Sequence, residues 1–146
     1  MKDIMLKITG KTVRQKEDVE SHEDVIEFVT EGKWYRKGAT TYVSYMESAL
    51  SGVEGCKTSL TITDDKVKMK RSGKPLGIPT IIEFEKGKRF KGLYDTPFGS
   101  VGMEVLTNSI TTFSDKEEGK NHLSIDYNVS LRGVSESRNK LDIEIM

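Results

Sequence analysis

Arg71 is the side chain in this sequence with the clearest capacity for chemistry. It alternates with Val67 and Met69, so a strand over residues 66–73 would place its guanidinium on their apolar side. An isolated charge on a buried face is very costly. A guanidinium also offers a two-pronged set of donors to a carboxylate or a phosphate. We therefore expect Arg71 to lie at the rim of the fold, to be neutralised by an internal acid, or to bind an anionic ligand.

Glu47 is the acid that the pattern places best to neutralise Arg71. It alternates with Tyr45, although the preceding turn leaves the register of that segment open by one residue. If a ligand is bound, Tyr45, Tyr94 and Tyr127 would line a cavity around Arg71, because tyrosine combines a wide apolar face with one polar tip. Without a ligand, Arg71 and Glu47 would form a structural ion pair. The sequence leaves both interpretations open.

Asn139 is a further polar residue on the expected inner side, opposite Val129 in the predicted pairing. One interpretation makes it a second ligand contact inside the fold. The other makes it a buried amide bonded to nearby main chain, because buried polar groups are almost always hydrogen-bonded.

No catalytic or metal-binding motif stands out. The single cysteine, Cys56, has no obvious base beside it, and His22 and His122 have no carboxylate cluster or second cysteine at ligand spacing. The sequence contains no Gly-x-Ser-x-Gly stretch and no phosphate-binding loop. We therefore predict a protein that is not an enzyme and that holds no metal and no cofactor.

Alternation of apolar and polar residues is the pattern that must position these side chains. It is clearest between residues 121 and 132, where Leu123 and Ile125 share one side. The same rhythm predicts ten strands, at residues 3–13, 23–37, 39–49, 57–63, 66–73, 80–86, 88–95, 99–113, 120–132 and 136–145. In the segment 99–113 the inward side is clear as far as Val105 and ambiguous near Asn108.

Three short connections predict antiparallel hairpins, because facing residues of such a pair point to the same side of the sheet. These connections are a turn at 64–65 and three-residue loops at 86–88 and 133–135. They set three apolar pairs opposite each other: Ile62 and Val67, Phe84 and Phe90, and Tyr127 and Leu141.

Charge supports the hairpin at 86–88 and argues against a nucleic-acid surface. Glu83 would face Lys91, and Glu85 would face Arg89, on the outer side. These acids alternate with the neighbouring cations, and no exposed aromatic platform for base stacking accompanies them. We therefore expect a solvated, charge-balanced surface and no nucleic-acid partner.

Ten strands with short links favour a closed barrel, because an open sheet of that length would leave long unprotected edges. A two-sheet sandwich is the competitor, but it usually needs longer crossovers. We predict an all-β fold in which residues 1–146 form one closed, mostly antiparallel up-and-down β-barrel of about 8–10 strands.

Bulk properties are those of a globular protein without a net charge that would favour nucleic acid or an anionic membrane, although they leave room for a local charged patch. The 146 residues include 23 Lys and Arg and 23 Asp and Glu, and no run of apolar residues is long enough for a membrane helix. A single cysteine excludes an intrachain disulfide. We expect a cytoplasmic protein that does not act at a membrane, and the sequence leaves its oligomeric state open.

Several local motifs together resemble the YwiB-like family of small bacterial β-barrel proteins. They are Glu31-Gly32 before an aromatic pair, the Tyr42, Tyr45 and Glu47 segment, Arg71-Ser72-Gly73, Tyr94-Asp95-Thr96-Pro97-Phe98-Gly99 leading to Met103, and Ser137-Arg138-Asn139. The resemblance implies a calycin-type barrel, like those of lipocalins or fatty-acid-binding proteins, and a ligand cavity. It supplies no catalytic residues.

The function that we expect is capture of a small, partly apolar molecule in the barrel lumen, with an anionic group as one option for its polar end. The residues expected to contact it are Tyr45, Glu47, Arg71, Tyr94, Tyr127 and Asn139. The alternative is a protein-interaction or assembly module whose barrel is filled by its own side chains and takes no small-molecule ligand.

Overall fold

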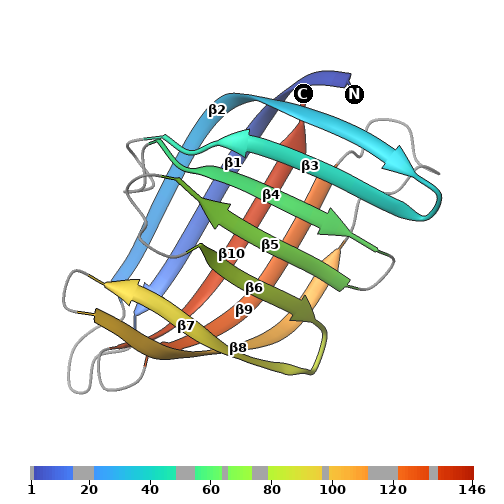
Figure 1. The fold of residues 1–146 in the computed structure, drawn as a ribbon. Helices are drawn as coiled ribbons and strands as arrows, with labels where there is room; N and C mark the ends of the chain where they lie inside the picture. The colour runs from blue at the N-terminus through green and yellow to red at the C-terminus, as the bar shows by residue number, and fades with distance from the viewer. Residues whose placement is uncertain are drawn as a thin grey trace.

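The computed structural model describes residues 2–14, 22–48, 55–63, 66–73, 79–96, 99–111, 122–131 and 135–146. These residues form ten β-strands and no helix (Figure 1). The strands are β1 (Lys2–Arg14), β2 (His22–Lys37), β3 (Thr40–Met46), β4 (Lys57–Ile62), β5 (Lys66–Ser72), β6 (Thr80–Glu85), β7 (Arg89–Thr96), β8 (Gly99–Thr111), β9 (His122–Leu131) and β10 (Ser135–Ile145). The ten strands predicted from the sequence are confirmed.

Alternating side chains give each strand one apolar face. In β5, Lys66, Lys68 and Lys70 are exposed, whereas Val67 and Met69 are buried. These apolar faces meet in one continuous core, which is the main source of stability in a sheet of this kind. The core contains Leu6, Ile8, Phe28, Val43, Tyr45, Leu60, Ile62, Val67, Met69, Phe84, Met103, Val105, Leu123, Ile125 and Ile143.

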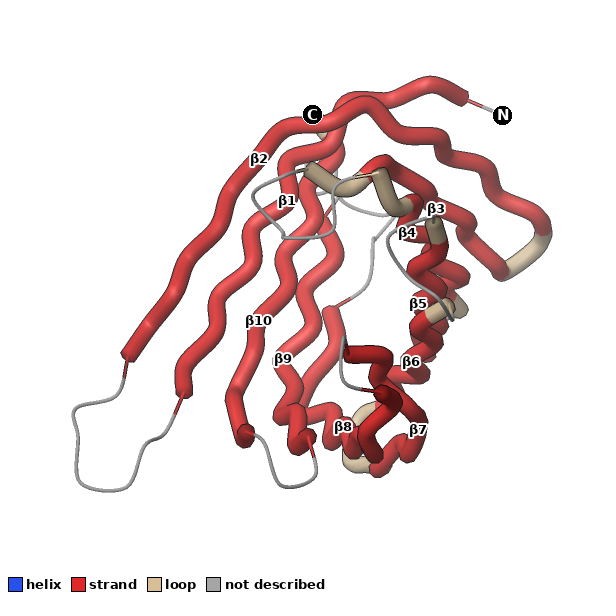
Figure 2. The backbone as a smooth tube through the Cα atoms, turned by 60° about the vertical axis from the view of Figure 1, so that its left-hand side comes forward, coloured by secondary structure: helices blue, strands red, loops and turns tan. Residues whose placement is uncertain are grey.

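The strands form one antiparallel meander that curls round until its ends meet. Their order across the sheet is β6-β5-β4-β3-β2-β1-β10-β9-β8-β7, so the first and last strands of the chain are neighbours. The two edge strands, β6 and β7, lie beside each other without forming a ladder (Figures 1 and 2). The prediction of an antiparallel up-and-down barrel is thus confirmed, with one unsealed seam.

The predicted ladder between the strands on either side of residues 86–88 is wrong. Phe84 pairs with Val67 on β5, and Phe90 pairs with Val105 on β8, so the two rings are not cross-strand partners. The reason lies at the turn: the Gly87 amide donates to the Thr107 carbonyl over 2.9 Å, which directs the chain toward β8.

The charged residues at this turn find other partners. Arg89 and Lys91 lie 3.1 and 3.6 Å from the Glu104 carboxylate on β8, instead of pairing with Glu85 and Glu83. Glu85 pairs with Lys88 at 3.2 Å, within the turn itself. Charge complementarity identified residues that form ion pairs but misassigned their partners. Exposed ion pairs are weak, so they do not determine which strands pair with each other.

The other two predicted hairpins form. The first has the expected register, with Ile62 opposite Val67. The second is shifted by two residues, so that Tyr127 faces Asn139 rather than Leu141. The expected pairing of Asn139 with Val129 is therefore also wrong. A shift of two residues keeps every side chain on the same face of the sheet, so the apolar pattern cannot detect it.

The ambiguity near Asn108 has a structural cause. The 99–113 segment contains one strand, β8, whose pairing with β9 shifts between Thr107 and Ser109. This β-bulge inserts one extra residue, which exchanges inward and outward positions beyond it. Val105 is therefore buried at an odd position, whereas Ile110 faces Ile125 at an even one.

Gly32 marks a close approach between neighbouring strands. It lies on β2 between Ile4 of β1 and Tyr45 of β3. A Cβ atom at this position would lie 2.7 Å from both the Leu6 Cδ1 atom and the Ser44 carbonyl oxygen. Because one of these atoms is main chain, the sheet itself would have to shift to make room.

We expect Gly32→Ala to lower the free energy of unfolding by about 1–3 kcal/mol, the usual cost of overpacking. Urea denaturation measures this change. Gly10→Ala is the matched control on β1, because its new methyl group would meet only the Ile26 side chain, at 3.2 Å, which can rotate away. Equal losses in the two variants would contradict the close approach at Gly32.

Candidate functional site: the interior polar cluster

Glu47, Thr58 and Arg71 form a hydrogen-bonded cluster on the inner side of the barrel. The Arg71 Nη2 atom lies 3.1 Å from Glu47 Oε1, and Arg71 Nε donates to the Thr58 hydroxyl over 3.3 Å. The Thr58 hydroxyl donates in turn to Glu47 Oε1 over 2.5 Å. Thr58 and Arg71 are cross-strand partners on β4 and β5, and Glu47 directly follows β3. Glu47 therefore has the inward orientation that the sequence left open.

The two charges of this pair differ in exposure. The Glu47 side chain is 2% exposed, whereas that of Arg71 is 28% exposed. A carboxylate as deeply buried as Glu47 needs its partners, because removing one partner of a buried ion pair typically costs about 3–5 kcal/mol. Arg71 is therefore anchored from its buried side and retains an accessible side.

Two tyrosines complete the cluster from different walls of the barrel. Burial raises the pKa of the Tyr45 hydroxyl well above its ordinary value, and the nearby Glu47 carboxylate raises it further, whereas the Arg71 charge opposes both effects. Burial also raises the pKa of Tyr127, again opposed by Arg71. Tyr45 lies on β3 and Tyr127 on β9, so the field of Arg71 reaches both sides of the interior.

Tyr127 is fixed by an aromatic contact and has a polar neighbour. Its ring meets Phe84 of β6 edge to face, with centroids 4.8 Å apart. Its cross-strand partner Asn139 accepts a hydrogen bond from the Thr12 hydroxyl over 2.8 Å and donates to the Ser137 hydroxyl over 3.0 Å. The described hydrogen bonds of the Asn139 side chain thus go to side chains rather than to the main chain.

Tyr94 does not join the cluster. It lies opposite Val101 on the edge strand β7 and is 37% exposed. Its position in the alternation points inward, but among the described strands β7 has no ladder partner on its seam side, so none of them covers the ring there. The structure therefore brings Tyr45, Glu47, Arg71 and Tyr127 together and leaves Tyr94 apart.

Thr107 is an interior polar residue that the sequence analysis did not select. It pairs with Tyr127, it is 1% exposed, and its hydroxyl has no hydrogen-bond partner in the part of the chain that the structure describes. The sequence feature that could have identified Thr107 is its place on the inward face of β8, following Met103 and Val105. Threonine is common in strands, so a single hydroxyl in such a row does not stand out.

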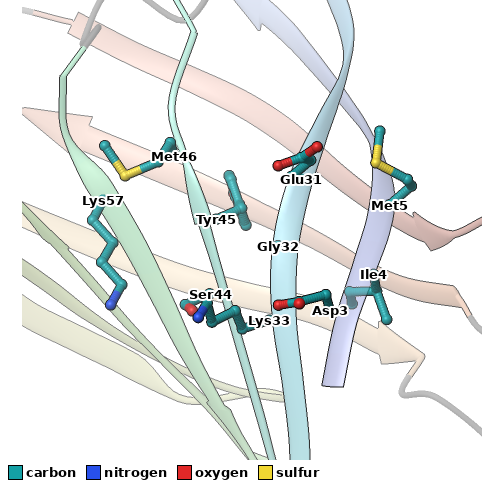
Figure 3. Close-up of a pocket in the computed structure, with 10 residues that line it drawn as sticks. All are labelled: Asp3, Ile4, Met5, Glu31, Gly32, Lys33, Ser44, Tyr45, Met46 and Lys57. Carbon is teal, nitrogen blue, oxygen red and sulfur yellow. The ribbon is translucent and has the colours of Figure 1, made fainter. Parts of the chain in front are cut away.

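Two hollows lie on the outer face of the barrel. The first, of about 610 Å³, crosses β1 to β4 and is lined largely by outward-facing residues such as Met5, Glu31 and Met46 (Figure 3). The second, of about 810 Å³, crosses β7 to β10 beside Arg138. Neither hollow is lined by Arg71. Within the described residues, no group of three or more His, Cys, Asp or Glu side chains is placed to hold a metal ion.

The raised pKa values of Tyr45 and Tyr127 predict a loss of stability at high pH. Their folded-state pKa values are raised above the ordinary value of 10.0, so the neutral form stabilises the fold below pH 10 and this contribution is lost as the pH rises further. Replacing Tyr45 or Tyr127 by Phe should therefore flatten the fall in unfolding free energy above pH 10, by up to about 1.4 kcal/mol per pH unit. Denaturant titrations at stepped pH measure the slopes, and curves that stay parallel above pH 10 would contradict the assignment.

Thr107 predicts a gain in stability upon substitution. Thr107→Val keeps the shape of the side chain and removes an unpaired buried hydroxyl, so the unfolding free energy should rise by about 1 kcal/mol. Thr58→Val is the matched comparison and should lower it, because the Thr58 hydroxyl bonds to both Glu47 and Arg71. A destabilised Thr107→Val protein would show that the hydroxyl has a partner.

This chain is similar to known proteins in both sequence and fold. The uncharacterized beta-barrel protein YwiB of Bacillus subtilis (strain 168) is 29% identical over 110 residues, which are 75% of this chain and 74% of that protein. The crystal structure of YwiB from Bacillus subtilis superposes with a TM-score of 0.66 and 22% identity, over 99% of this chain and 93% of that one, and shows the same fold. The resemblance to YwiB-like barrels is confirmed. A family model described as a domain of unknown function, DUF1934, matches residues 7–143, and the chain belongs to this family.

Proposed function

We propose that the protein is a binding protein of the cytoplasm, which takes up a small and mainly apolar molecule inside its barrel. Arg71 donates hydrogen bonds to the polar end of this molecule, and Tyr127 and the inward apolar side chains contact the remainder. The observation that carries the proposal is the unequal burial of the ion pair, with Glu47 2% and Arg71 28% exposed. Such an arrangement leaves a fixed cation with an accessible side.

The anchoring of Arg71 supports a role in positioning a ligand. Its described contacts use Nε and Nη2, which bond to Thr58 and Glu47. A guanidinium carries five N–H donors in a rigid plane, so two such contacts fix its orientation without using all its donors. A side chain that is held in this way loses little further entropy when it binds a ligand.

The charge balance narrows the class of ligand. Glu47 already neutralises Arg71, so a carboxylate or phosphate ligand would add an uncompensated negative charge near a buried carboxylate. Burying an unpaired charge is far more costly than burying a hydrogen-bonded neutral group. We therefore favour a neutral acceptor, such as a hydroxyl, carbonyl or amide group, over the anion that Arg71 alone suggests.

The environment of the Tyr127 side chain supports the presence of a space inside the barrel. Burial raises the pKa of its hydroxyl, yet the side chain retains accessible surface. Both properties are expected of a ring that is shielded from bulk water and borders an internal space. Leu141, which faces inward on β10, is also only partly buried.

The seam favours a second candidate function, a protein-interaction module with a filled barrel. Ile81 on β6 and Leu93 on β7 are exposed beside the unpaired edges of these strands. Exposed apolar side chains at an unpaired edge are typical of protein contacts. In this case, the ion pair of Arg71 and Glu47 would be purely structural.

Native mass spectrometry of the freshly purified protein tests the proposal. We expect a co-purified small molecule on the wild-type protein and its loss from the double variant Arg71→Met and Glu47→Leu. This variant should fold, because replacing both members of a buried ion pair by apolar residues of similar volume is often neutral.

Arg138→Met with Asp126→Leu is the matched control, because it removes an ion pair of 2.8 Å on the outer face and should leave the bound molecule in place. Wild-type protein without any bound molecule would argue for the filled barrel. Retention of the molecule by the interior double variant would exclude Arg71 as a contact.

A further inference from the structure

β2 has described ladders on both sides only from Gly32 to Trp34. It pairs with β1 from His22 to Trp34 but with β3 only from Gly32 to Lys37. Residues 22–31 therefore have β1 on one side and, among the described residues, no strand on the other. In Figure 2 this stretch of β2 runs along the outer left of the barrel. Within the described residues it is a long open strand edge, separate from the seam.

The open edge is built into the fold. The Thr30 hydroxyl donates to the carbonyl of Met46, the last residue of β3, over 3.3 Å. The next residue, Glu47, continues the pairing with β4, because its amide donates to the Cys56 carbonyl over 2.8 Å. The described pairing of β3 with β2 ends at Tyr45, opposite Gly32.

The outer face of this stretch alternates strictly between acid and valine. Its residues are Glu23, Val25, Glu27, Val29 and Glu31. Val25 and Val29 are 54% and 51% exposed, whereas Phe28 on the other face is buried in the core. Glu27 lies 3.3 Å from Lys7 of β1, and it is the one acid of this row that forms an ion pair with another described residue.

This row disfavours pairing with a second copy of the chain. An antiparallel pairing centred on Glu27 would set Glu27 against Glu27, Glu23 against Glu31, and Val25 against Val29. Shifting that pairing by two residues sets each overlapping acid against a valine. Like charges directly opposite each other are destabilising, and native edge strands use charge to prevent self-association.

A strand of complementary charge would fit the same row. Opposite each glutamate it would carry Lys or Arg, and opposite each valine an apolar residue, so each cross-strand pair would be favourable. The open N–H and C=O groups of the edge would supply main-chain hydrogen bonds, as in other cases of strand addition. The order of glutamate and valine along this row is the same in both directions, so a partner strand with the complementary pattern would match it in a parallel or an antiparallel orientation.

We propose that residues 22–31 of β2 bind an extended segment of a partner protein by strand addition, and that this segment alternates Lys or Arg with apolar residues on one face. This site is independent of the interior cluster and of any ligand bound there.

A synthetic nonapeptide, Lys-Thr-Val-Thr-Lys-Thr-Val-Thr-Lys, is the probe. Fluorescence anisotropy with the full chain should detect binding that weakens with added salt, because exposed charge pairs are screened. The same peptide with Glu in place of Lys should not bind. Hydrogen exchange should show new amide protection within residues 22–31.

The variant Glu23→Lys with Glu31→Lys should weaken binding of the lysine peptide about tenfold and allow the glutamate peptide to bind, because two favourable pairs become repulsive. Glu136→Lys with Glu144→Lys is the matched control. It changes the net charge equally on β10, which is paired on both sides, and should leave binding of the lysine peptide unchanged.

Absence of binding would overturn the proposal, as would binding without new protection in residues 22–31, or equal weakening in the two double variants. A dimer of the free chain whose formation protects residues 22–31 would also overturn it, because a second copy would then occupy the edge.

Discussion

The antiparallel ladder between β1 and β10 is the interaction on which the rest of this structure depends. It joins the two ends of the chain through nine residue pairs, from Leu6 opposite Ile145 to Arg14 opposite Ser137. Without it, β1 to β6 and β7 to β10 would be two separate sheets, each with an unpaired edge at both sides. With it, β5 and β9 face each other across an enclosed interior, and the charge of Arg71 acts on Tyr127. Because such contacts are distant in sequence, closure carries a large entropic cost before the core is formed.

The interior cluster shows how a polar group is accommodated in such a core. Glu47 lies where apolar side chains would otherwise pack, and it is tolerated because Thr58 and Arg71 both bond to one of its oxygens. A core of this kind gains specificity from polar groups only when their hydrogen bonds are satisfied. The Thr107 hydroxyl is the exception, because it has no partner among the residues that the structure describes.

The sequence predicted the strands and, outside the bulge near Asn108, the side of the sheet on which their residues lie. The alternation of Val67, Met69 and Arg71 placed the guanidinium inside correctly, because this periodicity is a property of one strand alone. It could not determine which strands become neighbours. The absent ladder between β6 and β7 depends on a main-chain bond between Gly87 and Thr107, two residues that are far apart in the sequence.

The candidate site was predictable only in part for a related reason. Arg71 and Tyr127 stood out as polar or amphipathic groups on an apolar face, but their meeting depends on how the sheet curls. Tyr94 satisfied the same alternation and still lies apart, because β7 became an edge. The two-residue shift that placed Asn139 beside Tyr127 changed no face of the sheet, so no apolar pattern could reveal it.

The seam between β6 and β7 has a mechanical consequence for the barrel. Where hydrogen bonds close a barrel completely, its circumference is fixed by the number and tilt of its strands. Here the two walls are joined at the seam by the connection at residues 86–88 and by side chains, with no ladder between them. Beyond the main-chain bond from Gly87 to Thr107, parting these walls breaks no ladder among the described strands, so the width of the interior can change while each wall keeps its own ladders. Width is thus the dimension in which this barrel can adapt to what it encloses.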